Sequence, residues 1–129
     1  MSTHSPHEET LVLGDSMHLV TTTTLPTTSA GGPPPLIALL TNSGVIGRAG
    51  PHRMNVRLAR QFAEMGIPSI RFDMSGLGDS KRAPGTAPQT EQWVADTRTA
   101  MDAAQAQFGP VRFFMIGFCS GAEVAHLTA

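Results

Sequence analysis

A pentapeptide near the end of the sequence contains the residues best suited to chemistry. It reads Gly117-Phe118-Cys119-Ser120-Gly121, with a glycine two residues to either side of the only cysteine of the chain. This spacing is typical of a sharp turn from a strand into a helix, which strains the middle residue. The unpaired N–H groups of a helix N-terminus would favour the nucleophilic thiolate there. The pattern predicts that Cys119 is a nucleophile, and an inert buried cysteine is the alternative.

Attack on a carbonyl also needs hydrogen-bond donors for the developing oxyanion. The backbone N–H of Ser120, directly after the cysteine, is one candidate. Gly44 or Val45, in the glycine-bearing segment 42–50, is the other. An ordinary connection between two elements is the alternative interpretation of that segment.

Regular elements must position these residues, and the hydrophobic pattern predicts which ones. Short apolar runs between glycines and prolines indicate strands, and apolar residues at helical spacing indicate helices. The strands are expected at 9–13, 18–25, 36–40, 67–72 and 111–116, and the helices at 51–65, 91–108 and from 122 onward. Thr90 is the expected cap of the second helix. A hairpin followed by alternating strands and helices predicts an α/β fold with parallel strands and crossover helices.

Three segments, in the same order, resemble motifs of the α/β-hydrolase superfamily, and more narrowly bacterial hydrolases of the serine aminopeptidase type. They are residues 42–53, 71–80 and 117–122. The resemblance covers residues 42–125 and implies an α/β-hydrolase-like fold with an incomplete sheet, formed by 1–129 as one partial domain. It also implies hydrolysis of an ester or other acyl bond. Cys119 stands where serine is usual, as in the dienelactone hydrolase branch.

The middle segment resembles the Asp-x-x-Gly-x-Gly-x-Ser turn of these hydrolases. Asp73 and Asp79 lie in it, and both are expected to fix the turn by accepting hydrogen bonds from backbone N–H groups. The first segment departs from the common pattern, because Asn42 and Ser43 stand where many members have His-Gly.

The acid and the base of a catalytic triad are not apparent. In this fold they follow the nucleophile along the chain, and only residues 122–129 come after the pentapeptide. The one histidine there, His126, would lie about two helical turns, roughly 10 Å, from Cys119. We therefore expect His126 on the helix surface and the acid and base beyond this chain. The alternative function is a non-catalytic fragment or a hydrolase-like binding module.

Composition excludes several other classes of protein. The formal net charge of −1 over 129 residues gives no field to attract nucleic acid or an anionic membrane. No apolar run approaches the ~20 residues of a membrane span, and neither metal-binding cysteine clusters nor a nucleotide-binding glycine motif is present. We expect a cytoplasmic protein without a cofactor that takes a small-molecule acyl substrate. Self-association through an open sheet edge is expected as well.

Overall fold

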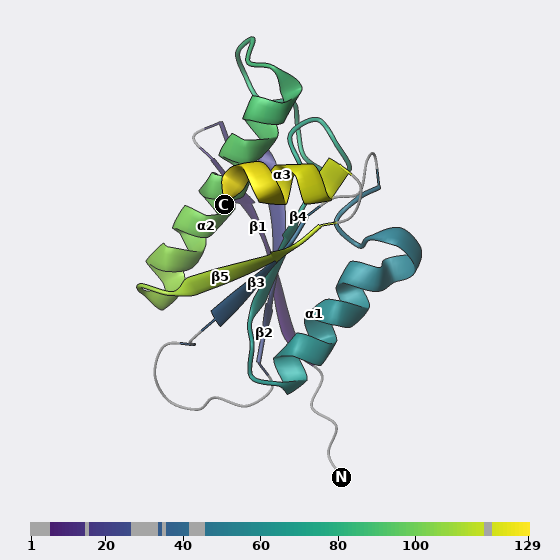
Figure 1. Ribbon diagram of the computed structural model, residues 1–129, viewed down its shortest axis with the longest axis vertical. Helices are drawn as coiled ribbons and strands as arrows, with labels where there is room; N and C mark the ends of the chain where they lie inside the picture. The colour runs from purple at the N-terminus through teal and green to yellow at the C-terminus, as the bar shows by residue number, and fades with distance from the viewer. Residues whose placement is uncertain (1–5, 15, 27–33, 35, 42–45, 118–119) are drawn as a thin grey trace.

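The fold consists of a mixed sheet with helices on its two faces (Figure 1). The computed structural model describes residues 6–14, 16–26, 34, 36–41, 46–117 and 120–129, with only the backbone of 120 and 121. The strands are β1 (His7–Leu13), β2 (Leu19–Leu25), β3 (Leu36–Leu40), β4 (Ser69–Phe72) and β5 (Arg112–Ile116). The helices are α1 (Met54–Glu64), preceded by a 3₁₀ turn (Pro51–Arg53), α2 (Gln89–Phe108) and α3 (Ser120–Thr128). The predicted order of strands and helices is confirmed.

The strands lie in the order β1-β2-β4-β3-β5. β1 and β2 form the predicted antiparallel hairpin, and β2 also pairs antiparallel with β4. β3 pairs in parallel with β4 on one side and with β5 on the other. β5 is therefore an edge strand within the described residues, and the carboxyl ends of β3, β4 and β5 meet at one end of the sheet.

Alternating side chains of β4 give the sheet one apolar and one polar face. Ile70 and Phe72 belong to the core cluster that also contains Ala100 and Ala104 of α2 and Val124 of α3. The predicted apolar face of α2 is confirmed, since Trp93, Met101 and Phe108 also pack against this cluster. α1 lies on the other side of the sheet from α2 (Figure 1). Helices thus cover both faces of the parallel strands, as an α/β architecture requires.

Apart from β3, the starts of the elements differ from the sequence prediction by one to three residues, and at α2 and β4 a proline directly precedes the element. α2 begins at Gln89, with Pro88 as the residue before it, and no side chain caps its N-terminus. The prediction that Thr90 caps this helix is therefore wrong. The fixed φ of proline lets the helix start earlier, and the N–H of Gln92 already bonds to the carbonyl of Pro88. β4 begins at Ser69 rather than at residue 67, although the Pro68 carbonyl still accepts a bond from Ala38.

Candidate functional site

Two hydrogen bonds connect the carboxyl ends of β3 and β5, where the candidate site begins. The backbone N–H and the hydroxyl of Thr41 both donate to the carbonyl of Ile116, each at 3.2 Å. The segments that leave these two strands therefore start beside each other. Those segments contain the predicted oxyanion donors Gly44 and Val45 and the predicted nucleophile Cys119, all three of which lie outside the described residues.

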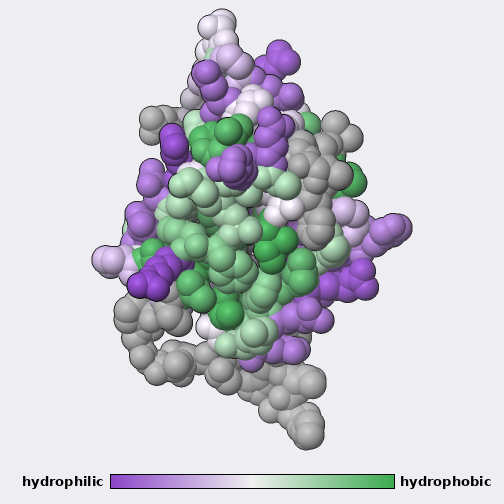
Figure 2. Space-filling view, viewed as in Figure 1, coloured by the Kyte–Doolittle hydropathy of each residue, from purple (hydrophilic) through white to green (hydrophobic). Residues whose placement is uncertain are grey.

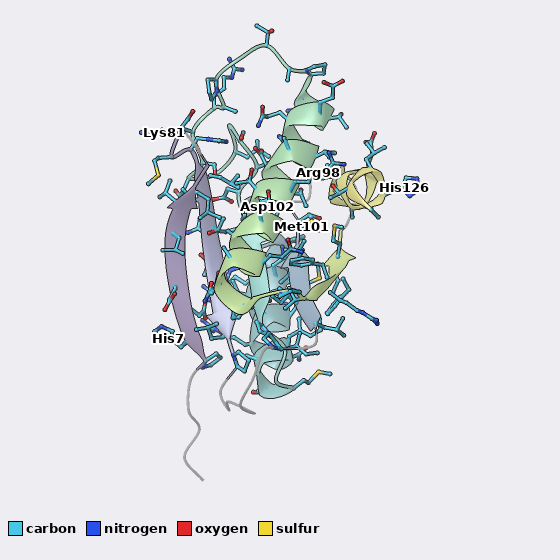
Figure 3. All side chains as sticks on the ribbon, turned by 90° about the vertical axis from the view of Figure 1, so that its left-hand side faces the viewer. His7, Lys81, Arg98, Met101, Asp102 and His126 are labelled. Carbon is cyan, nitrogen blue, oxygen red and sulfur yellow. The ribbon has the colours of Figure 1, made fainter. Side chains whose placement is uncertain are left out.

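The elements on either side of the pentapeptide lie where the sequence predicted them. β5 ends at Ile116, and α3 begins at Ser120. The N–H groups of the first turn of a helix have no partner within that helix, so Ser120 lies at a position that can donate a backbone hydrogen bond. His126 is exposed on α3, as predicted, and points away from the rest of the molecule (Figure 3).

The turn after β4 is built around the buried carboxylate of Asp73, which is 1% exposed. Its Oδ1 accepts the backbone N–H of Arg48 at 2.6 Å, and its Oδ2 accepts that of Asp79 at 3.0 Å. The prediction that Asp73 fixes the turn through backbone N–H groups is confirmed. Gly78 has a φ of +51°, and a Cβ there would lie 2.5 Å from Cγ of Asp73. Only glycine leaves room for the carboxylate at that position.

Ser80 closes the same turn against the neighbouring strand. Its hydroxyl donates to the carbonyl of Asp73 at 2.6 Å and accepts the N–H of Val20, next to the start of β2, at 2.8 Å. Asp73, Gly78 and Ser80, three members of the Asp-x-x-Gly-x-Gly-x-Ser pattern, therefore all stabilise the same turn. They hold the turn at the carboxyl end of β4 in a single conformation.

Arg48 links this turn to the loop after β3. Its guanidinium Nη1 bonds to Asp73 at 2.7 Å and to Asp79 at 2.8 Å, while Nε donates to Thr22 at 3.0 Å. Burial would lower the pKa of Arg48, but its hydrogen bonds to Asp79 and Asp73 and their charges outweigh burial and raise that pKa. Asp79 is 72% exposed on its side chain, so the pair with buried Asp73 contributes more. The sequence analysis missed the role of Arg48 as the partner of Asp73, although a buried carboxylate is stabilised only when it is paired or hydrogen-bonded.

Asn55 anchors the loop after β3 from the side of α1. Its backbone N–H donates to Ala49 at 3.0 Å, and its buried side-chain amide donates to the carbonyl of Thr41 at 3.4 Å. The loop is therefore held where it leaves β3 and where it enters the 3₁₀ turn. Nothing in the sequence pattern indicated this asparagine, because it lies inside a helix at a position that looks solvent-facing.

A second buried carboxylate, Asp96 on α2, braces the turn from the opposite side. It accepts the backbone N–H and the hydroxyl of Ser75, each at 2.7 Å, and the amide of Gln92 at 2.8 Å. His18 lies 3.6 Å from the same carboxylate. The hydroxyl of Ser75 thus donates to a carboxylate that also accepts the backbone N–H of the same residue. The sequence analysis missed this cluster, and its arrangement supports a structural role.

A hollow of about 490 Å³ lies along the polar face of the sheet beside α1. Arg71 and Arg60 line it and both bond to Glu8 of β1. Burial would raise the pKa of Glu8, but the hydrogen bonds and charges of Arg71 and Arg60 outweigh burial and lower that pKa. Arg53 and Arg57 are exposed. The charges facing the hollow are mostly paired with one another, which favours a structural role for this face.

A smaller hollow of about 380 Å³ lies between the turn after β4 and the start of α2. Leu77 and Trp93 give it apolar walls, and Arg82 gives it one cation.

In the described part of the chain, no three histidine, cysteine, aspartate or glutamate residues are grouped so that they could hold a metal ion. No described helix is long and apolar enough to cross a membrane.

The strand order, the crossover helices and the junction between β5 and α3 define an α/β hydrolase. The family model for serine aminopeptidase, S33, matches residues 45–129, which is more than half of the chain. The chain therefore belongs to this family of α/β hydrolases. A search of curated protein sequences found no match.

Solved structures of α/β hydrolases share this fold at low sequence identity. An α/β serine hydrolase without lid from Xanthomonas campestris is 22% identical, with a TM-score of 0.69, over 100% of this chain and 57% of its own. An α/β serine hydrolase homologue from Coxiella burnetii is 16% identical, with a TM-score of 0.69, over 100% of this chain and 59% of its own. A dienelactone hydrolase-like promiscuous phosphotriesterase from metagenomic libraries is 18% identical, with a TM-score of 0.70, over 97% of this chain and 54% of its own. This chain thus spans little more than half the length of these proteins.

Proposed function

We propose that Cys119 is the nucleophile of an acyl-transfer reaction on a small ester. The thiolate Sγ attacks the carbonyl carbon, and the π electrons of the carbonyl move to its oxygen. The backbone N–H of Ser120 and that of Gly44 or Val45 stabilise this oxyanion. When the carbonyl re-forms, the bond to the alkoxy group breaks, the alkoxide takes a proton from solvent, and a thioester remains on Cys119.

The observation that carries this proposal is the pair of hydrogen bonds from Thr41 to Ile116. Thr41 directly precedes the segment that contains Gly44 and Val45, and Ile116 directly precedes the pentapeptide that contains Cys119. Membership of the serine aminopeptidase family supports a hydrolytic reaction in general.

Hydrolysis of the thioester needs a general base and an acid that orients it. In this proposal they belong to the part of the protein that the similar structures have and these 129 residues do not. The 129-residue chain should therefore carry out the first half of the reaction, a single acylation, and no rapid turnover.

The test is the reaction of the chain with p-nitrophenyl acetate near neutral pH. We expect the release of about one equivalent of p-nitrophenolate and a mass increase of one acetyl group, both abolished in Cys119→Ala. Because the chain has one cysteine, alkylation by iodoacetamide reports on the same atom, and it should be faster than with free cysteine. If Cys119 of the folded chain is alkylated but never acylated, the chain is the non-catalytic alternative, a hydrolase-like module without acyl transfer.

A further inference from the structure

The hollow of about 490 Å³ beside α1 is lined by more cations than anions. Its charged residues are four arginines and three carboxylates, namely Arg48, Arg53, Arg60, Arg71, Glu8, Asp73 and Asp79. Four positive and three negative side chains leave a net charge of +1. The ion pairs among these residues brace the walls of the hollow, and the surplus charge remains for a ligand.

The surplus is not spread evenly, because one end of the hollow has an excess of negative charge. There the guanidinium of Arg48 pairs with two carboxylates, Asp73 at 2.7 Å and Asp79 at 2.8 Å. This end has no cation to spare for an anionic ligand. The positive charge is therefore concentrated at the opposite end, around Glu8.

At that end a single carboxylate serves two arginines. Oε1 of Glu8 accepts a hydrogen bond from Nε of Arg60 at 3.2 Å, and Oε2 accepts one from Nη2 of Arg71 at 2.5 Å. Arg53 also lines the hollow, and no carboxylate of the described residues pairs with it. Three positive charges and one negative charge leave a local surplus of two positive charges.

The three arginines lie at different depths. The side chain of Arg71 is 8% exposed and is held by Thr24 as well as by Glu8, so it forms a fixed, buried part of the lining. Arg60 is half exposed and Arg53 is exposed. Arg53 has a φ of +60°, which residues other than glycine adopt only at an energetic cost. Residues in such conformations cluster at functional sites, ligand clamps among them.

We propose that the end of the hollow at Glu8 binds a doubly charged oxyanion, a phosphate group, between Arg53, Arg60 and Arg71. A phosphate group carries a charge of about −1.5 to −2 near neutral pH, which matches the local surplus. Its oxygens accept paired hydrogen bonds from the planar guanidinium group. Glu8 occupies some of the same donors and competes with the ligand. The site does not depend on acyl transfer at Cys119.

The experiment is a ³¹P NMR titration of inorganic phosphate with the 129-residue chain at constant ionic strength, because salt screens exposed charges. We expect saturable binding, and its absence would overturn the inference. Phenyl phosphate, observed in the same way, separates the two sources of the group: tighter binding identifies a phosphate monoester, and equal binding identifies the inorganic ion. Benzoate, with one charge, should displace phosphate only weakly. Displacement by benzoate at equal concentration would refute a site for a doubly charged anion.

Arg60→Gln and Arg57→Gln form a matched pair of variants. Both remove one exposed cation from α1, but Arg57 donates to the carbonyl of His52 and lies outside the hollow. Arg60→Gln should weaken phosphate binding at least about fivefold, and Arg57→Gln should leave it within about twofold. An equal loss in both would mean that phosphate senses only the net charge of the chain, and would overturn the inference. If Arg60→Gln does not fold by circular dichroism, Arg53→Gln takes its place with the same two outcomes.

Glu8→Gln should act in the opposite direction, since it removes the competing carboxylate and leaves the arginines in place. We expect phosphate to bind about fivefold more tightly. Glu9→Gln is its control, because Glu9 carries the same charge on the next residue of β1 and bonds to His7 instead. Its affinity should stay within about twofold of the parent chain. A purely structural role for Glu8 predicts no gain in affinity, so unchanged or weaker binding in Glu8→Gln would refute the proposed site.

Discussion

Two glycines of the turn after β4 offer a matched pair of substitutions that tests its construction. Gly76 and Gly78 both have positive φ, +81° and +51°, so alanine at either position is strained. Left-handed backbone costs a residue with a Cβ about 1–2 kcal/mol. At Gly76 nothing lies within 4 Å of the added Cβ, so this strain is the whole expected effect of Gly76→Ala.

Gly78→Ala adds a collision to the same strain. Its Cβ would lie 2.5 Å from Cγ of Asp73, a buried side chain whose oxygens accept three hydrogen bonds from Arg48 and Asp79. The carboxylate must move, and each bond to a charged group that is lost costs about 1.5–3 kcal/mol. We therefore expect Gly78→Ala to lower the free energy of unfolding by about 3–5 kcal/mol. That is a large part of the roughly 5–15 kcal/mol typical of a domain.

The assay is urea-induced unfolding followed by the fluorescence of Trp93, the only tryptophan, which packs against the core. It is repeated at several protein concentrations so that association is not mistaken for stability. The two variants should differ by at least about 2 kcal/mol in the free energy of unfolding. If Gly78→Ala and Gly76→Ala lower the free energy of unfolding by the same amount within about 0.5 kcal/mol, the close approach to Asp73 does not affect stability, and the reasoning is wrong.

Three further predictions concern other parts of the molecule. Asp96→Ala leaves the backbone N–H and the hydroxyl of Ser75 without their acceptor, so it should lower the free energy of unfolding in urea by about 2–4 kcal/mol. Asp102 lies at an exposed position of the same helix (Figure 3), and Asp102→Ala should change the free energy of unfolding by less than about 0.5 kcal/mol. The folded-state pKa of Glu8 is lowered below its ordinary value of 4.5. The ionised carboxylate therefore stabilises the fold above pH 4.5, and this stabilisation is lost as the pH falls through the lowered pKa. The difference in the free energy of unfolding between the parent and Glu8→Gln should vanish in acid, and a difference that stays constant with pH would contradict this. We expect the 129-residue chain to associate through the outer edge of β5, which pairs with no other strand among the described residues. An unpaired strand beside an apolar surface is a template for pairing, and Figure 2 shows apolar side chains gathered over β5 and α3. Light scattering should give a mass above that of the monomer, and a monodisperse monomer at every concentration would contradict this prediction.

Most of the fold could be predicted from local patterns in the sequence. β3 is a wholly apolar run between breakers, and the apolar spacing of α2 continues to Gly109, so strand and helix follow from periodicity. The end of β5 and the start of α3 on either side of the pentapeptide follow from glycine spacing. These features depend on residues close together in the sequence, which is why the sequence alone determines them.

The polar contacts that organise the candidate site were decided by tertiary structure. Arg48 and Asp73 are 25 residues apart, and Ser75 and Asp96 are 21 residues apart. Each aspartate looked like an ordinary surface or turn residue, because burial of a carboxylate is visible only when the sheet and the helices have packed around it. A buried charge must find its donors among whatever backbone the fold brings near. The sequence therefore determined which segments carry the chemistry, and only the packing of β3, β4 and α2 decided which side chains hold those segments in place.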